Sequence, residues 1–266
     1  MTAPTESPRA PRRPGPVTRT VGVLGEVLLT LGVLGLLFVV WEVWWTGLGA
    51  DAERDRAAGE LYAQLDQQQD GSDADAAEDD EPSADLIHDL AEDTEVIGML
   101  YVPRLEEDGT LPIREGVGSD SIDRIAVGHY PTTQMPGEPG NFALAGHRDI
   151  YGRILYDQDQ LVPGDRIYVQ SPDGYFTYEV TESYVVPPDR TEVLEPVPGA
   201  PGEDPEDASV LTLTTCDPPY VASDRLITHA DFVEATPLSE GPPEAITDRV
   251  EAAADAGTGP AAEGED

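Results

Sequence analysis

The single thiol of this 266-residue chain, that of Cys216, ends a short run in which apolar and hydroxyl side chains alternate. With the two-residue period of a β-strand, Leu211 and Leu213 fall on one face and Thr212, Thr214 and Cys216 on the other. Two prolines follow shortly after the cysteine and end the strand, because proline has no N–H to give to a neighbouring strand. A thiol at a strand end is a candidate nucleophile once its proton is removed, since the thiolate is the reacting species.

A guanidinium is expected beside this thiol. Residues 225–233 form a second strand-like run after eight loop residues, and Arg225 is its first member. If the two strands pair as a hairpin, the end of the first and the start of the second share one rim of the sheet. Arg225 cannot act as a base at ordinary pH, but a fixed cationic donor suits an oxyanion.

Histidine is the usual partner of a catalytic thiol, and the chain has four. His88 lies in an acidic linker outside the predicted fold. His147 follows a glycine just beyond a predicted strand at 141–145, a rim position like that of Cys216. His129 ends another short strand and is the alternative partner, whereas His229 lies within its strand and is expected in the barrel wall or the core. A lone strand cysteine is more often a small buried hydrophobe than a nucleophile.

The elements that must position these groups are short strands separated by turn signals every eight to fifteen residues. Strands are predicted at 96–102, 141–145, 165–170 and 175–180, the last two joined by a Ser-Pro-Asp-Gly turn with a glycine free to take positive φ. This spacing predicts a mostly β domain, a small closed or nearly closed β-barrel, over residues 94–238. The irregular connection at 187–208 is either a lid or a tolerated surface insertion.

Flanking segments differ from the domain in composition. Residues 1–20 carry four arginines against one glutamate and read as a basic cytoplasmic arm. Residues 21–45 are almost entirely apolar and as a helix would extend roughly 38 Å, enough for one N-terminal transmembrane helix. The positive-inside rule then sends the rest of the chain out of the cytoplasm, to the extracytoplasmic face of the cell membrane. The competing interpretation is a cleaved signal peptide, because Ala50-Asp51-Ala52 has the Ala-x-Ala form.

Acidic residues dominate the remaining flanks. Residues 46–93 are predicted to be an acidic disordered linker, with a weak helix as an alternative for residues 57–69, and residues 239–266 are predicted to be an acidic disordered tail. The formal net charge of −38 excludes nucleic acid as a partner, because phosphates would be repelled. With one cysteine, an intramolecular disulfide is impossible.

Several ordered motifs resemble one family. They are Thr212-Leu213-Thr214-Thr215-Cys216 followed by Arg225, Gly128-His129-Tyr130-Pro131, Met135-Pro136-Gly137-Glu138, and Gly140-Asn141-Phe142-Ala143-Leu144-Ala145-Gly146-His147-Arg148. Over residues 96–237 the chain is similar to the sortases, in particular to their actinobacterial class E branch.

That resemblance implies a membrane-anchored cysteine transpeptidase on an eight-stranded β-barrel with short helices. Cys216 would be the nucleophile, His147 the general acid and base, and Arg225 the oxyanion donor. The substrate would be a secreted protein with a C-terminal Leu-Ala-x-Thr-Gly or Leu-Pro-x-Thr-Gly sorting signal, cut between Thr and Gly through a thioacyl-enzyme. The acceptor would be an amine of a peptidoglycan precursor or a pilin, and neither a metal nor an organic cofactor is required.

Three further residues take their interpretation from the resemblance. Tyr130 occupies a position associated with alanine in the signal, although it could simply pack at the rim. Thr215 would contact the substrate threonine, with ordinary strand hydrogen bonding as the alternative. Asp217 departs from the commoner family pattern, and its carboxylate beside the thiol would slow the enzyme.

Two other functions remain open. The first is a non-catalytic, membrane-anchored β-barrel binding module that displays its acidic segments to partners or cations. The second is a thiol hydrolase that uses water as its acceptor and shares the same three residues.

Overall fold

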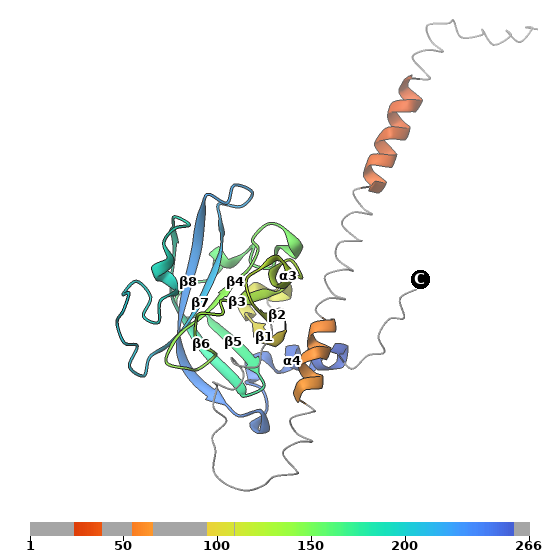
Figure 1. Ribbon diagram of the computed structural model, residues 1–266. Helices are drawn as coiled ribbons and strands as arrows, with labels where there is room; N and C mark the ends of the chain where they lie inside the picture. Colours follow the sequence, from red (N-terminus) through yellow and green to blue (C-terminus); the bar gives the residue numbers. More distant parts are fainter. Residues whose placement is uncertain (1–23, 39–54, 66–94, 109, 258–266) are drawn as a thin grey trace, which may run out of the picture. The chain divides into compact units, whose positions relative to one another are not determined.

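Eight β-strands close into a barrel in the order β1-β2-β3-β4-β7-β8-β6-β5 (Figure 1). The β2–β3 and β4–β7 pairs are parallel, and all other neighbouring pairs are antiparallel. The strands are Val96–Tyr101 (β1), Thr110–Glu115 (β2), Val127–His129 (β3), Gly140–Ala145 (β4), Arg166–Ser171 (β5), Gly174–Val186 (β6), Ser209–Asp217 (β7) and Asp224–Thr236 (β8).

Short helices lie in the connections and after the last strand. They are Pro103–Asp108 (η1), Ser119–Ile122 (α3), Tyr151–Arg153 (η2), Gln158–Gln160 (η3), Thr191–Leu194 (η4), Leu238–Glu240 (η5), Glu244–Ile246 (η6) and Thr247–Gly257 (α4). The expectation of a mostly β, eight-stranded barrel with short helices is therefore confirmed.

This computed structural model describes residues 24–38, 55–65, 95–108 and 110–257. The chain divides into two units, residues 1–48 and residues 49–266. Within the first unit, residues 24–38 form a helix with exposed side chains. Within the described ranges no helix is both long enough and apolar enough to cross a membrane. The predicted segment 21–45 extends past this helix at both ends, and those ends, the arm at 1–20 and His88 lie outside the described residues.

The barrel interior is filled by the apolar side chains that alternate along the strands. Leu211 and Leu213 of β7 are both 0% exposed and face this interior, as the two-residue period predicted. The side chains at 212, 214 and 216 therefore lie on the other face of β7. The interior also receives, among others, Leu100, Leu111, Ile113, Phe142, Leu144, Ile154, Leu155, Ile167, Val169 and Tyr178.

The predicted turn between the strands at 165–170 and 175–180 is present. Ser171 of β5 pairs with Gly174 of β6. Gly174 has φ +144°, and a Cβ added there would lie 2.7 Å from the carbonyl oxygen of Thr236. Glycine is required at this position both by the backbone conformation and by the close approach of β8.

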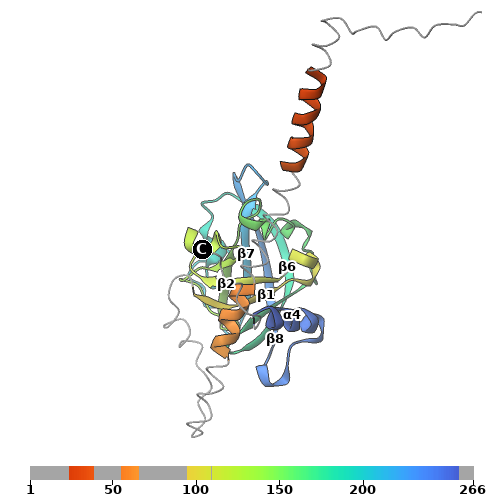
Figure 2. The ribbon, with the colours of Figure 1, turned by 90° about the vertical axis from the view of Figure 1, so that its right-hand side faces the viewer.

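A second apolar cluster on the outside of the barrel corrects the predicted domain limits. The helix over residues 55–65 buries Ala57, Ala58, Leu61 and Leu65, which share one helical face. Three of these side chains, Ala57, Leu61 and Leu65, pack with others from β1, β5, β6 and the C-terminal segment, namely Val96, Met99, Tyr101, Tyr168, Tyr175, Ile246 and Val250. Figure 2 shows the 55–65 helix and α4 near β1.

Segments predicted as disordered are thus ordered in part, over 55–65 and over 239–257. The prediction followed their acidic composition, whereas the apolar residues at helical spacing decide their packing. Ile246 is 1% exposed and Val250, four residues later, is 6% exposed.

Ile246→Ala tests this packing. Removing a buried isoleucine side chain leaves a cavity, so we expect the free energy of unfolding to fall by about 2–5 kcal/mol in urea titrations. The matched control is Glu251→Ala, at an exposed position of α4, which should change that free energy by less than about 0.5 kcal/mol. Equal, small effects of both substitutions would contradict the packing of this segment.

Candidate active site

The β7–β8 hairpin places a guanidinium directly across from the thiol. Cys216 of β7 pairs with Arg225 of β8 in the antiparallel register. Directly opposed residues present their side chains on the same face of a sheet, with Cβ atoms about 4.5–5.5 Å apart. Both residues are partly exposed. The predicted hairpin and its shared rim are therefore present.

The Arg225 guanidinium bonds to the backbone at the start of β8 and in the turn that precedes it, and it does so through one of its three nitrogen atoms. Its Nη1 donates to the carbonyl oxygens of Asp224 at 2.9 Å and Ala222 at 3.3 Å. Among the described residues, Nε and Nη2 have no hydrogen-bond partner. A guanidinium has five N–H donors in a fixed planar arrangement, so donors remain for a ligand on the Cys216 side of the rim.

The parallel pairing of β4 with β7 carries His147 to the same rim. Ala145 pairs with Thr214, and the N–H of Gly146 continues the ladder to the Thr214 carbonyl oxygen at 3.1 Å. His147 and Cys216 each follow two residues after the Ala145–Thr214 pair. Because the carboxyl ends of parallel strands meet at one edge, the imidazole and the thiol start from neighbouring positions of the backbone.

The backbone on both sides of His147 is fixed. The Thr215 hydroxyl donates to the Gly146 carbonyl oxygen at 2.8 Å, and the N–H of Leu155 donates to the His147 carbonyl oxygen at 3.1 Å. A Cβ at Gly146 would lie 2.7 Å from Cδ1 of Leu155. Glycine therefore lets this segment approach the interior side chains closely, just before the histidine.

The His147 side chain has two neighbours that the sequence did not identify. Its Nε2 lies 2.6 Å from Oδ1 of Asp123, the residue that follows α3. Its ring lies 5.0 Å from the ring of Tyr151, measured between centroids. The side chains of His147 and Asp123 are 19% and 28% exposed. Nothing in the local pattern around residue 123 signalled this contact, because it depends on tertiary packing.

Arg148 compensates the acidic residue that follows the thiol. Its buried guanidinium pairs with the carboxylate of Asp217 through Nη1 and with that of Asp159 through Nη2, the latter at 3.3 Å. The same Nη1 donates to the carbonyl oxygen of Cys216 at 3.4 Å. The charge that was expected to slow the thiol is therefore neutralised by an arginine. The sequence did contain a signal for this ion pair, because Arg148 follows His147 and Asp217, with the opposite charge, follows Cys216.

Asp149 joins the two loops that flank the site. Its carboxylate accepts a hydrogen bond from the backbone N–H of Tyr220, in the connection between β7 and β8. The segment that carries His147 and the loop that precedes Arg225 are thereby connected directly.

The two rival histidines are engaged inside the protein. His129 is 0% exposed and its Nδ1 lies 2.8 Å from the Glu115 carboxylate. His229 is 4% exposed, and burial lowers its pKa to about 4, so it is neutral at pH 7. Its ring nitrogens contact Thr212 at 2.9 Å and Tyr184 at 2.8 Å. His147 is thus the partly exposed histidine among the three that the structure describes.

The Tyr130 side chain contacts the outer face of β7, whereas the Thr215 side chain, which belongs to β7, is on the opposite face. The Tyr130 hydroxyl is 3.2 Å from that of Thr214, which shares a face with Cys216. Thr215 points toward the barrel interior side, is 2% exposed, and makes the hydrogen bond to Gly146. Tyr130 therefore contacts the face of β7 that carries the thiol, whereas the Thr215 hydroxyl is bonded within the protein.

The connection at 187–208 is attached to the barrel wall. The side-chain amide of Asn141 donates to the carbonyl oxygens of Val193 and Glu195, each at 3.1 Å. The side-chain oxygen Oδ1 of Asn141 in turn accepts a hydrogen bond from the Thr212 hydroxyl at 2.7 Å. Val193 is buried, so the part of this connection around η4 covers the start of β4.

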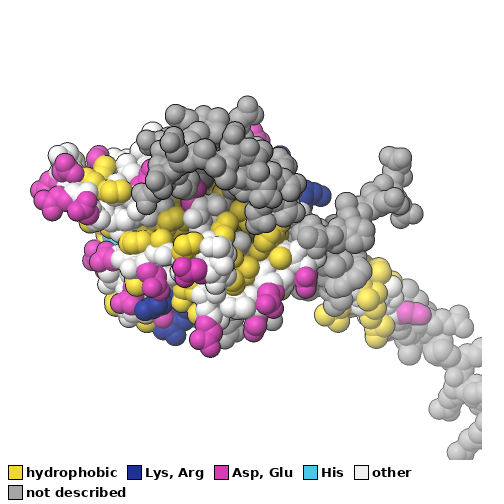
Figure 3. All heavy atoms as spheres, turned by 90° about the horizontal axis from the view of Figure 1, so that it is seen from below, with side chains coloured by type: hydrophobic (Ala, Val, Ile, Leu, Met, Phe, Trp, Pro, Cys, Tyr) yellow, Lys and Arg dark blue, Asp and Glu magenta, His cyan; other side chains and the backbone are white. Residues whose placement is uncertain are grey.

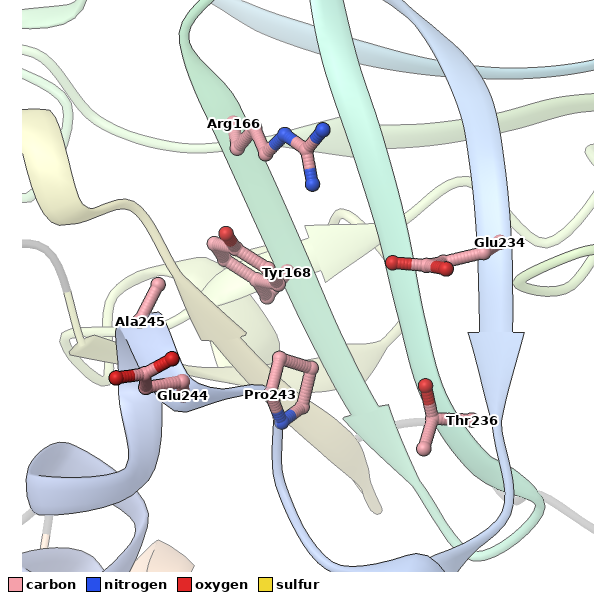
Figure 4. A pocket seen from close by; sticks show the side chains of 7 residues that line it. All are labelled: Arg166, Tyr168, Glu234, Thr236, Pro243, Glu244 and Ala245. Carbon is pink, nitrogen blue, oxygen red and sulfur yellow. The ribbon is translucent and has the colours of Figure 1, made fainter.

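A pocket lies at the end of β8 opposite to Arg225. This pocket of about 590 Å³ is lined by Arg166, Tyr168, Glu234, Thr236, Pro243, Glu244 and Ala245 (Figure 4). Glu234 and Thr236 come from the carboxyl end of β8, whereas Arg225 stands at its start. The lining has no cysteine or histidine, so the pocket is separate from the thiol chemistry.

Acidic side chains lie on the surface of the described part of the chain. Acidic side chains are spread over the face shown in Figure 3, between hydrophobic and uncharged ones. Within the described parts of the chain, no group of three or more His, Cys, Asp or Glu side chains could hold a metal ion.

The part of the chain that is similar to known proteins includes all the site residues described above. The sortase domain family model matches residues 100–233. Sortase SrtE1 of Streptomyces coelicolor is 35% identical over 243 residues, which are 88% of this chain and 63% of that protein. The chain thus spans less than two thirds of the length of this curated relative.

Two solved structures are similar over the barrel. The SrtA sortase from Actinomyces oris is 40% identical with a TM-score of 0.55, covering 59% of this chain and 89% of that one. The crystal structure of Sortase E1 from Streptomyces coelicolor with a tripeptide in the active site is 36% identical with a TM-score of 0.51, covering 57% of this chain and 96% of that one.

The pairing of Arg148 with Asp217 leads to a test of thiol reactivity. In Arg148→Gln the carboxylate is left uncompensated next to the thiolate, so alkylation of Cys216 by iodoacetamide at pH 7 should slow roughly fivefold to tenfold, a change of about 1–1.4 kcal/mol. The double variant Arg148→Gln/Asp217→Asn removes that charge and should regain most of the rate. Equal rates in the parent chain and in Arg148→Gln would contradict this role, and circular dichroism would show whether each variant is folded.

Proposed function

The chain belongs to the sortase family, and from this premise we propose that it is a class E-like cysteine transpeptidase with Cys216, His147 and Arg225 as its catalytic residues. The observation that carries the proposal is the register at one end of the barrel. Arg225 stands opposite Cys216, and the parallel β4–β7 pair ends beside them with His147.

The first half of the reaction breaks a peptide bond. The Cys216 thiol transfers its proton to His147, and the thiolate attacks the carbonyl carbon of the substrate's Thr–Gly bond. Arg225 donates hydrogen bonds to the oxyanion that forms. When the C–N bond breaks, His147 gives its proton to the leaving glycine amine, and the threonine remains joined to sulfur as a thioester.

The second half forms a new amide. An acceptor amine attacks the thioester carbonyl, and His147 takes the proton that the amine loses. The C–S bond then breaks and the thiolate is regenerated. The acceptor is an amine of a peptidoglycan precursor or of a pilin, and the cleaved protein becomes attached to it through its threonine.

Substrate selection is proposed at the face of β7 that carries the thiol. The substrate is a C-terminal sorting signal of the Leu-Ala-x-Thr-Gly or Leu-Pro-x-Thr-Gly type on a secreted protein. Tyr130 lies next to Thr214, one same-face position before Cys216, and we assign it the contact with the second residue of the signal. Because the Thr215 hydroxyl is bonded to Gly146, this residue supports the His147 segment, and its direct contact with substrate stays a prediction.

The barrel is proposed to work outside the cytoplasm, held at the membrane by the apolar segment 21–45. The helix over residues 24–38 lies within that segment, and the arginines before it favour a cytoplasmic N-terminus. In this arrangement the enzyme meets its secreted substrates as they leave the membrane.

A peptide assay of the 266-residue chain tests the proposal. We expect a fluorogenic Leu-Ala-x-Thr-Gly peptide to be cleaved. When triglycine is added, mass spectrometry should detect a product in which triglycine is joined to the threonine-side fragment. Cys216→Ala should reduce this reaction to background, and Arg225→Ala should lower kcat by about 10²- to 10³-fold, as the loss of an oxyanion donor does.

The matched control is Arg166→Ala, which removes an exposed arginine from β5 and should leave kcat within about twofold. Cleavage that survives Cys216→Ala, or no cleavage of either signal type by the parent chain, would favour a non-catalytic binding module. Free acid as the sole product in the presence of abundant triglycine would identify a hydrolase.

A further inference from the structure

We propose that Asp123 is a positioning residue for His147, which directs Nδ1 of the imidazole to the proton transfers and stabilises the imidazolium that they create. This inference rests on the proposed function, because it assigns Asp123 a part in the same reaction. It is carried by the 2.6 Å contact between Nε2 of His147 and Oδ1 of Asp123.

The contact fixes which ring nitrogen carries a proton. An ionised carboxylate can only accept hydrogen bonds, so Nε2 is the donor in this pair. Because the acceptor is ionised, this hydrogen bond is charge-assisted, which makes it stronger than one between neutral groups. In the neutral imidazole Nδ1 then has the free lone pair, and among the described residues it has no other partner. Nδ1 is therefore the nitrogen that takes the proton of the thiol.

Asp123 is itself held in place by short-range bonds. Its backbone N–H donates to the Ser119 carbonyl oxygen at 3.1 Å, which closes the turn of α3. Ser121 within α3 is buried and donates through its hydroxyl to the Glu115 carbonyl oxygen at 2.7 Å, at the end of β2. The carboxylate thus projects from a short helix that is fastened to the barrel wall.

A second contact holds the same two segments together. Gly152 of η2 has φ +83°, and a Cβ at this position would lie 2.9 Å from Cγ2 of Ile125. The connection after α3 therefore touches the segment after His147 at a point where a glycine permits close approach. Asp123 and His147 lie between these anchored points, so their separation is set by packing as well as by their hydrogen bond.

The other charged groups near His147 have different partners. Arg148 is engaged by Asp217 and Asp159, and Asp149 accepts from the Tyr220 backbone. Arg225 of β8 is opposite the thiol, and its positive charge disfavours a second positive charge on the His147 ring. Asp123 is then the carboxylate that contacts the imidazole, and it offsets this unfavourable effect when the ring is protonated.

Substitution of Asp123 should change the pH dependence of catalysis as well as its rate. Transfer in this site needs a thiolate and an imidazolium together, which gives a bell-shaped curve of kcat/KM against pH. Without the carboxylate the imidazolium is less stable, so in Asp123→Asn the acid limb should move to lower pH and the maximum should fall about 10- to 100-fold. Asp123→Glu keeps a carboxylate and should recover part of both changes.

The matched control is Asp120→Asn, which removes an exposed carboxylate from α3 and should leave the curve unchanged. A curve for Asp123→Asn with the height and the limbs of the parent chain would overturn the proposal, as would equal activity of Asp123→Ala and Asp123→Glu.

A spectroscopic measurement separates this inference from the proposed function. In the ¹⁵N-histidine-labelled full chain, the imidazole resonances of His147 should report a proton on Nε2 at pH 8, and that preference should weaken in Asp123→Ala. A proton on Nδ1 in the parent chain would refute the role of Asp123 even if the enzyme is active. Conversely, an inactive parent chain with the expected resonances would remove the proposed function while the Asp123 contact stands.

Discussion

The parallel pairing of β4 with β7 is the constraint on which the rest of the site depends. Antiparallel neighbours can be joined by a tight turn, but a parallel pair requires a long crossover, here through β5, β6 and the connection at 187–208. This crossover separates His147 from Cys216 along the chain and returns them to one edge of the barrel. Arg225 needs no such route, because the hairpin that begins at Cys216 delivers it to the opposite position.

At this edge of the barrel, negative side chains are neutralised by individual ion pairs, although the chain as a whole is strongly acidic. The chain has a net charge of −38, yet the carboxylate that follows the thiol in the chain and the carboxylate in contact with the imidazole are each paired with a group that can be positive. Asp217 is paired with buried Arg148, and Asp123 with His147. The acidic surface therefore does not determine the field at the thiol, since close contacts in a partly desolvated site outweigh exposed charges that solvent screens.

Short-range patterns were sufficient for most of the strands, the hairpin and the position of Arg225. Alternation placed Leu211 and Leu213 in the interior, and glycine and proline marked the turns. On both sides of the barrel in the sequence, the acidic composition predicted disorder. The helix at 55–65 and the η6–α4 segment are instead ordered, because each buries apolar side chains at helical spacing. Asp123 could not be found from the sequence, because its contact with His147 depends on how α3 packs against the loop after β4, which no local pattern encodes.

The most direct test is a crystal structure of the full chain modified covalently at Cys216 by a sorting-signal peptide that carries a thiol-reactive ketone at the position of the threonine carbonyl. The account predicts a guanidinium nitrogen of Arg225 about 3 Å from the ketone oxygen and Nδ1 of His147 facing the sulfur, with Nε2 still on Asp123. A structure in which Arg225 points away from the ketone oxygen, or in which the His147 ring lies beyond reach of the sulfur, would contradict it.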